Sequence, residues 1–223
     1  MRKTMTLAAL AAAAMVSAPA MAGSPDGKLQ VKVLGTGVLV DGKITKVKSD
    51  PLSLTPGAQT DINNNVVPTV AIEYFATPNV SVETICCLTQ HHATGKGALN
   101  GAQLVDHIMI LPATVTLKYH LDAGAIKPYV GIGPSLFLFI NEKPGATART
   151  LGVTNLKLSN EVGFALQGGV DIPVNDQGMG ISIDAKKYFM DTTATFRAGG
   201  TKVLVTKHKL DPWVVSAGIS YRF

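Results

Sequence analysis

The chain ends with an alternating segment that restricts the possible folds more than any other feature. In LDPWVVSAGISYRF, residues 210–223, one face of an extended strand is apolar and the other is small, polar or basic. The apolar face carries Trp213, Val215, Ala217, Ile219, Tyr221 and Phe223, and the opposite face carries Val214, Ser216, Gly218, Ser220 and Arg222. A soluble domain would bury the apolar face and end on a polar tail. A final strand that ends on Phe therefore indicates an apolar medium outside the fold.

The first residues predict export from the cytoplasm. Arg2 and Lys3 precede an apolar run, and Ala20-Met21-Ala22 has the form of a cleavage site. We expect residues 1–22 to be a cleaved signal peptide and residues 23–223 to form one domain. No later stretch has the roughly 18 consecutive apolar residues of a membrane helix. The mature chain is then either soluble in the periplasm or spans a membrane as a closed β-barrel. Without Arg2 and Lys3 its net charge is about +3, too small and too scattered to predict a nucleic-acid partner.

Apolar residues recur with a period of two through the mature chain, which predicts strands. The predicted strands are 28–40, 66–76, 80–90, 107–121, 127–140, 158–172, 180–194 and 210–223. Short connections follow the second, fourth and sixth strands, and long polar connections follow the others. This alternation predicts an all-β, eight-stranded antiparallel transmembrane β-barrel with short periplasmic turns and long extracellular loops. A soluble lipocalin-like barrel is the competing fold, but it would place apolar residues inside, whereas here the charged residues lie on the face without the apolar series. In the seventh strand, AKKYFMD fits either face.

Several motifs also resemble a known family. The motifs are TPNVSVE, LPATVTLKYHL, KPYVGIG, KKYFMDTTATF and the terminal LDPWVVSAGISYRF. In order along the mature chain, they resemble the OmpW family of outer-membrane proteins, which includes AlkL-like members. One departure is Ala113, where relatives often have a second proline after Pro112. The resemblance implies an eight-stranded barrel in the Gram-negative outer membrane that admits small hydrophobic molecules.

The inward positions separate by height along the barrel. Charged residues lie toward the periplasmic end, where we expect a charge network of Lys32, Glu73, Glu83, Lys118, Asp171, Asp184 and Arg222. Apolar residues that we expect to line the channel lie higher, namely Leu34, Val38, Ile85, Ile108 and Val214. The simplest interpretation is structural, because an eight-stranded barrel is just wide enough for side chains to fill it and buried charges must be paired.

The same residues allow a transport interpretation. An apolar mouth would accept a hydrophobic solute and a charged floor would refuse it, so the solute would leave sideways through the wall into lipid. Pro112 and Pro134 are the candidates for a lateral opening, because each removes a ladder donor within a strand. A bend needed only for curvature explains the two prolines equally well.

Other classes of function have less support. Cys86 and Cys87 are adjacent, so they are interpreted as small hydrophobes rather than as a disulfide, and His91 and His92 cannot both face one metal in an extended chain. No motif supplies a nucleophile with its base, so we expect no enzymatic activity, catalytic residue, metal or cofactor. A non-transporting structural or adhesive barrel that acts through its extracellular loops is the main alternative. The expected partners are outer-membrane lipid, small hydrophobic solutes and the barrel-assembly machinery, for which Phe223 resembles the terminal assembly signal.

Overall fold

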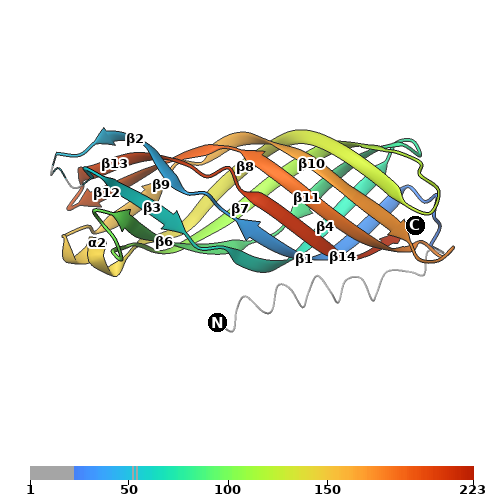
Figure 1. Cartoon of the computed structure of the whole chain (residues 1–223), viewed down its shortest axis with the longest axis horizontal. Helices are drawn as coiled ribbons and strands as arrows, with labels where there is room; N and C mark the ends of the chain where they lie inside the picture. Colours follow the sequence, from blue (N-terminus) through green and yellow to red (C-terminus); the bar gives the residue numbers. More distant parts are fainter. Residues whose placement is uncertain (1–22, 52, 54) are drawn as a thin grey trace.

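Eight antiparallel strands close into a barrel in the computed structural model, which describes residues 23–51, 53 and 55–223. The predicted signal peptide, residues 1–22, lies outside the described residues. The barrel strands are β1 (Leu29–Leu39), β4 (Asn65–Phe75), β5 (Val80–Cys86), β7 (Gln103–His120), β8 (Lys127–Pro144), β10 (Glu161–Pro173), β11 (Met179–Phe189) and β14 (Trp213–Arg222). They pair in this order, and β14 pairs with β1 to close the barrel (Figure 1). The predicted fold class is confirmed. Each predicted strand overlaps one barrel strand, but the predictions for 80–90 and 180–194 extend past the ends of β5 and β11.

The long connections are not the loops that the sequence suggested. Most of their length forms further strands and one short helix beyond one end of the barrel, at the left of Figure 1. These elements are β2 (Lys43–Ser49), β3 (Ala58–Ile62), β6 (Thr89–Gly97), α2 (Ala146–Thr150), β9 (Asn155–Leu158), β12 (Asp191–Ala198) and β13 (Thr201–Lys209). Four of them form a separate sheet in the order β2–β13–β12–β9, while β3 and β6 extend the barrel sheet along β7. Their outward residues are mostly polar, so they lack the outward apolar series of the barrel strands.

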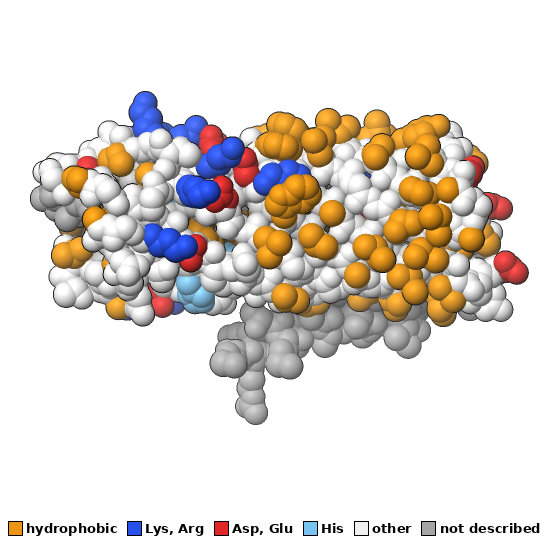
Figure 2. Space-filling model, viewed as in Figure 1, with side chains coloured by type: hydrophobic (Ala, Val, Ile, Leu, Met, Phe, Trp, Pro, Cys, Tyr) orange, Lys and Arg blue, Asp and Glu red, His pale blue; other side chains and the backbone are white. Residues whose placement is uncertain are grey.

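The barrel strands place apolar side chains outside and polar or small ones inside. Val162, Ile219 and Val130 are 74%, 64% and 61% exposed, whereas the inward Lys32 and Lys118 are 1% and 0% exposed. On the face that Figure 2 shows, hydrophobic side chains gather over the half of the molecule formed by the barrel, and we call this region the hydrophobic belt. This arrangement is inverted relative to a soluble barrel and matches a barrel surrounded by lipid. No helix in the described part of the chain is long and apolar enough to cross a membrane.

The short turns and the two ends of the described chain lie at the same end of the barrel. Residues 76–79, 121–126 and 174–178 connect consecutive strands there. The backbone N–H of Phe223 donates to the carbonyl of Leu29 at 2.8 Å, and the N–H of Leu29 donates back at 2.9 Å. In outer-membrane barrels the end with short turns is periplasmic, so the β2–β13–β12–β9 sheet extends on the extracellular side.

The hydrogen-bond ladders on both edges of β7 are interrupted, one at Pro112 and the other opposite Pro134. The β5–β7 ladder ends at Ile85 and Thr114, and the β6–β7 ladder begins in the same register at Thr89 and Ile110. Residues 87–88 between them are outside any strand, and the shared register places them opposite Pro112 and residue 111. Proline has no N–H to donate, so the wall loses ladder bonds at this height.

A second interruption lies on the other edge of β7. The β7–β8 ladder is missing between Thr114–Ser135 and Leu117–Ile132, the stretch of β8 that contains Gly133 and Pro134. A methyl group on Gly133 would collide with the carbonyl oxygen of Val115, so the two strands approach too closely there for any larger residue.

Candidate functional site: a charged floor below apolar cavities

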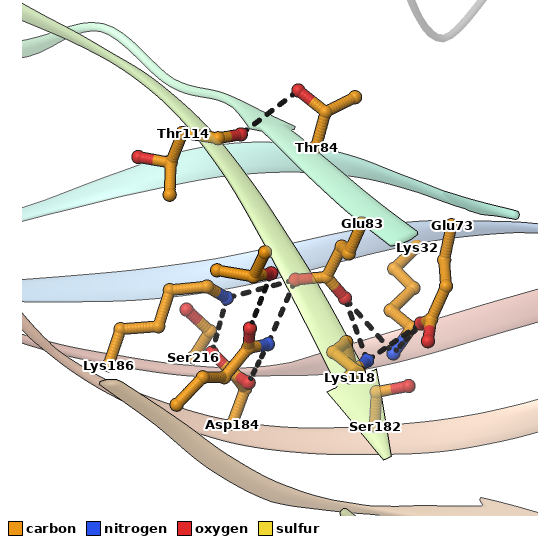
Figure 3. Close-up of polar contacts among 12 residues, drawn as sticks. Lys32, Glu73, Glu83, Thr84, Thr114, Lys118, Ser182, Asp184, Lys186 and Ser216 are labelled. Atoms are coloured by element: carbon orange, nitrogen blue, oxygen red, sulfur yellow. Dashed lines mark hydrogen bonds and ion pairs between the residues drawn. The ribbon is translucent and has the colours of Figure 1, made fainter. Parts of the chain in front are cut away.

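A buried network of charged side chains crosses the periplasmic half of the lumen. Its members come from six different strands of the barrel, so it joins the walls across the interior (Figure 3). We define the charged floor as Lys32, Glu73, Glu83, Lys118, Asp171, Asp184 and Lys186, all of which are at most 8% exposed.

Glu83 lies at the centre of the charged floor. Its carboxylate is 3.0 Å from the ammonium nitrogen of Lys118, 3.4 Å from that of Lys32 and 3.1 Å from that of Lys186. The side-chain amide of Gln167 also donates to it at 2.9 Å. One carboxylate therefore connects three lysines, and its removal would leave their charges in a low-dielectric interior with fewer partners.

Glu73 forms a second junction nearer the periplasm. It accepts from Lys118 at 2.8 Å, lies 2.8 Å from the Lys32 ammonium nitrogen and accepts from the Ser81 hydroxyl at 2.5 Å. The Nε2 atom of His120 lies 2.9 Å from the same carboxylate. Each acceptor of Glu73 thus has a partner, as a buried charge requires.

Asp184 connects the floor to an aromatic side chain. It accepts from Lys186 at 2.7 Å and from the Tyr129 hydroxyl at 3.0 Å. The ammonium group of Lys118 lies over the Tyr129 ring, 3.6 Å from its centroid, which adds a cation–π contact in a dry site. Tyr129 therefore fills the space between two parts of the network.

Asp171 completes the floor at its periplasmic edge. It accepts from Lys32 at 3.1 Å and from the Ser182 hydroxyl at 2.5 Å. Of the predicted network, five residues are joined directly by ion pairs, and they are Lys32, Glu73, Glu83, Lys118 and Asp171. The sixth, Asp184, is linked to Glu83 through Gln167 and Lys186.

Arg222 is buried as predicted, but it does not join the ion pairs. Its guanidinium lies 3.6 Å from the centroid of the Phe75 ring, and its Nε donates to the carbonyl of Gly27 at 2.6 Å. No ion pair among the described residues includes it, which corrects its assignment to the network. Its strand ends at the periplasmic rim, where chain-end carbonyls and an aromatic face are closer than the acids.

Sequence reasoning missed Lys186, which carries the third lysine charge of the floor. AKKYFMD alternates Lys and aromatic residues so that either face could be apolar, and only the pairing of β11 decides that Lys186 and Tyr188 point inward. Gln167 also lies on the inward face, where its amide donates hydrogen bonds to Glu83 and Asp184 and so forms a neutral bridge between two carboxylates.

A layer of hydroxyl groups lies above the charged floor. Thr36 and Ser216 are 2.8 Å apart, and Thr114 and Ser135 are 2.6 Å apart, with the Tyr188 hydroxyl 3.3 Å from Thr114. These groups satisfy one another, so the layer has no free polar group to hold the apolar cavity above it open to water.

A narrow apolar cavity follows at the height of Pro112, with about 430 Å³ of space between its lining atoms, open solvent included. Its lining includes Val38, Val214, Phe137 and Cys87. Pro112 is buried and borders this cavity, beside the interruption between β5 and β7. Pro134 is exposed on the outer surface and does not border it.

A larger cavity lies in the extracellular extension. It encloses about 1050 Å³, including solvent at its mouth, and its lining is almost entirely apolar, with Phe196, Leu158 and Ile108 among its members. Leu151, which is 56% exposed, also lines it and brings its rim to the surface. Leu210 borders both this cavity and the one at Pro112, so the two lie one above the other along the barrel.

The predicted apolar lining residues divide between two places. Val38 and Val214 border the cavity at Pro112, and Ile108 borders the larger one. Leu34 and Ile85 are buried inside the barrel but pack with Ala71 in a small separate cluster instead of lining either cavity. Their positions are nearer the charged floor, where neighbouring side chains fill the lumen.

Below the charged floor the lumen opens again to the periplasm. A vestibule with about 410 Å³ of space, open solvent included, is lined by residues that include Phe75, His120 and Arg222. The charged floor thus separates a periplasmic vestibule from the apolar cavities above it.

Comparisons with known proteins agree with this architecture. The model of the OmpW family matches residues 25–223. The chain is 34% identical over 220 residues to outer-membrane protein y4mB of Sinorhizobium fredii, covering 96% of this chain and 90% of that protein. It is 30% identical over 170 residues to outer membrane protein W of Salmonella typhi, covering 73% and 76% of the two chains.

Solved structures show the same fold. The crystal structure of OprG from Pseudomonas aeruginosa superposes with a TM-score of 0.78 at 24% identity, covering 91% of this chain and 99% of OprG. The solid-state NMR structure of AlkL in DMPC bilayers superposes with a TM-score of 0.71 at 25% identity, covering 93% and 95%. The chain therefore belongs to the OmpW family and is a non-enzymatic eight-stranded β-barrel of the Gram-negative outer membrane.

Proposed function

We propose that this barrel is a channel for passive uptake of small hydrophobic molecules. A solute enters the extracellular cavity, descends to the cavity beside Pro112, and leaves sideways between β5 and β7 into the membrane. The observation that carries this proposal is the position of a wall interruption next to an apolar cavity and above a closed, fully paired floor.

The charged floor makes a straight path to the periplasm unfavourable for an apolar solute. To pass, the solute would have to separate ion pairs such as Lys118–Glu83, which are buried and 3.0 Å apart. Leaving such groups without partners costs on the order of several kcal/mol, more than the contacts of a small apolar ligand return at that point.

A lateral exit avoids this cost because the solute moves from one apolar medium to another. Pro112 donates no hydrogen bond, and residues 87–88 opposite it lie outside any strand. Fewer ladder bonds must break there than elsewhere between β5 and β7. Pro134, on the lipid-facing side of β8, contributes to bending of the wall instead.

A reversible crosslink across the interruption tests the route. We would introduce Leu88→Cys and Leu111→Cys, which the shared register places opposite each other, in a Cys86→Ser, Cys87→Ser background. The oxidised protein in liposomes should take up a fluorescent hydrophobic solute at least fivefold more slowly than the same protein after reduction. The matched control is Val33→Cys with Ile219→Cys in the same background, which pairs β1 and β14 where the ladder is continuous.

The possible outcomes separate the two functions. Slower uptake with the crosslink at 88–111 and unchanged uptake with the control support the lateral channel. Unchanged uptake with the 88–111 crosslink formed contradicts the lateral route. If the wild-type protein does not accelerate uptake at all, the channel is wrong and a structural or adhesive barrel is the better explanation.

A further inference from the structure

Lysines gather on the outer surface just beyond the extracellular edge of the hydrophobic belt. They come from β2, β11 and β13, and we define the outer lysine cluster as Lys43, Lys46, Lys48, Lys187, Lys207 and Lys209. Figure 2 shows basic and acidic side chains gathered at this edge of the belt, beside the part that Figure 1 labels β2 and β13.

Trp213 marks the height of this cluster relative to the membrane. It is 49% exposed, begins β14 on the lipid-facing side, and has Lys187 as its partner on β11. The Lys187 ammonium group lies 5.3 Å from the centroid of the indole ring. Aromatic residues at the end of the apolar band define the interface, so the cluster lies at the height of lipid headgroups in the outer leaflet.

The lysines are placed against one another across the β2–β13 ladder. Lys46 faces Lys207, and Lys43 faces Lys209. Like charges directly opposite each other destabilise an antiparallel pair. An anion bound over the two strands would remove that repulsion.

The cluster is only partly neutralised by acids of the chain. Asp191 lies 2.7 Å from Lys207, Asp211 lies 3.0 Å from Lys209, and Asp41 lies 3.0 Å from Lys43. The remaining lysines have other contacts, since Lys48 donates to the Thr193 hydroxyl at 3.0 Å and Lys187 to the carbonyl of residue 211 at 2.5 Å. No ion pair among the described residues includes Lys46, Lys48 or Lys187.

A groove joins the cluster to the lipid-facing wall. Its lining includes Lys48, Lys207 and Lys209, the acids Glu161, Asp191 and Asp211, and the apolar Val162 and Phe189. Val162 is 74% exposed, and the ring of Phe189 stacks on a neighbouring phenylalanine with centroids 4.7 Å apart. Two of these lysines are paired with acids of the groove, so the lysines outside ion pairs, Lys46 and Lys48, provide the free positive charge beside the apolar surface.

The periplasmic rim has the opposite charge balance. Exposed Asp26, Asp122 and Asp176 lie there, with Lys28 and Lys127 as the basic residues. A general attraction to anionic headgroups would favour lysines at both rims. Among the described residues the lysines gather only at the extracellular rim, and this difference in charge between the two rims indicates a ligand in the outer leaflet.

We infer that the outer lysine cluster binds the phosphorylated glycolipid of the outer leaflet, with the sugar phosphates on Lys46, Lys48 and Lys207 and the acyl chains against Val162 and Phe189. The inference rests on the surface of the barrel and is independent of the proposed transport route. A second phosphate group can reach Lys43 or Lys209, so a diphosphorylated headgroup should bind more tightly than a monophosphorylated one.

The single tryptophan of the chain provides the readout. The intact mature protein in DMPC bilayers would be titrated with diphosphorylated lipid A while Trp213 emission is recorded. The wild type should respond saturably. Lys46→Gln with Lys48→Gln should weaken binding at least fivefold, because both side chains are exposed and outside the ion pairs. The matched control, Lys143→Gln with Lys202→Gln, removes the same charge elsewhere in the extracellular extension and should stay within twofold of wild type.

Three other results would overturn the inference. If the two double variants bind lipid A equally well, the position of the lysines on the extracellular extension does not determine binding. An equal response to phosphatidylglycerol would indicate general attraction to anionic lipid. An equal response to inorganic phosphate would indicate a simple anion site without a role for the acyl chains.

Discussion

The two halves of the lumen use the same strands for opposite purposes. In the periplasmic half, inward positions carry long charged side chains such as Lys118 and Glu83, which meet at the centre and leave no passage. In the extracellular half, inward positions carry shorter apolar side chains such as Val38 and Val214, and cavities remain between them. An eight-stranded barrel is therefore closed or open depending on whether its inward side chains can pair across the interior.

This difference extends to the wall. Beside the charged floor, the pairing of β1 with β4 and β14 is unbroken through Lys32. Beside the apolar cavity, the wall is interrupted at Pro112. The second interruption, between β7 and β8, includes Thr116, which pairs with Glu83 of the charged floor. The wall at Pro112 therefore differs in having an apolar cavity behind it, whereas the wall at Thr116 has the paired charges of the floor behind it.

The largest expected effect is on the charged floor. Glu83→Ala should lower the free energy of unfolding by roughly 3–5 kcal/mol, because three buried lysines lose a shared partner. Urea unfolding in detergent micelles would measure it. Asp122→Ala, in an exposed turn, is the control and should change stability by less than about 0.5 kcal/mol. A loss below about 1 kcal/mol for Glu83→Ala would mean that the network does not close the barrel.

The second expected effect is on the rate of solute uptake through the apolar half of the lumen. Leu210→Asn places an amide between the two cavities, and a solute that displaces water from that amide loses about 1–3 kcal/mol. Uptake into liposomes should fall roughly tenfold, the equivalent of about 1.4 kcal/mol. Val47→Asn, on the exposed face of β2, should leave uptake unchanged. If Leu210→Asn takes up the solute at the wild-type rate, solutes do not pass between the two cavities.

A smaller effect is expected from pH in the extracellular extension. Burial lowers the pKa of His208 below its ordinary value of 6.5, while its hydrogen bond to the carbonyl of Gly42 opposes the shift. The unfolded segment then binds a proton more readily than the folded one, so stability is complete above pH 6.5 and falls as the pH drops below it. Hydrogen exchange in β13, corrected for its intrinsic rate, should be faster at pH 5.5 than at pH 7.5. His208→Gln should remove this difference, and its persistence in the variant would assign the effect to another group.

The smallest effect on folded stability is expected at the chain end. The backbone of Phe223 pairs with Leu29 whatever its side chain, so Phe223→Ser should cost less than about 1 kcal/mol in the folded barrel. Its insertion into the outer membrane should nevertheless fall several-fold if the terminal aromatic is an assembly signal. Membrane fractionation would compare it with Tyr221→Ser, which removes a neighbouring ring but keeps the terminal one. Equal insertion of the two variants would contradict that role.

The sequence predicted the barrel strands and most of the charged floor because both follow from one rule. Alternation places every second residue inward, so Lys32, Glu73 and Lys118 could be assigned from their spacing alone. Lys186 could not, because both faces of its segment contain lysine and aromatic residues. Arg222 was placed on the correct face, but its partners depend on where the strand ends relative to the rim.

The extracellular sheet was missed for a different physical reason. Strands such as β2 and β13 extend beyond the membrane, where their outward face contacts water and carries lysines. Without a lipid-facing apolar series, their alternation is lost in the sequence. The cavity inside this extension, and therefore the upper part of the proposed route, required the structure.

The most direct test is to locate a hydrophobic solute inside the barrel. A spin-labelled hydrocarbon added to isotopically labelled protein in lipid bilayers would broaden the NMR signals of nearby residues. Broadening is expected at Ile108, Val38 and Val214, while the signals of Glu83 and Lys118 stay unchanged. Broadening of the Glu83 and Lys118 signals to the same degree would place the solute in the charged floor and contradict the proposed division of the lumen.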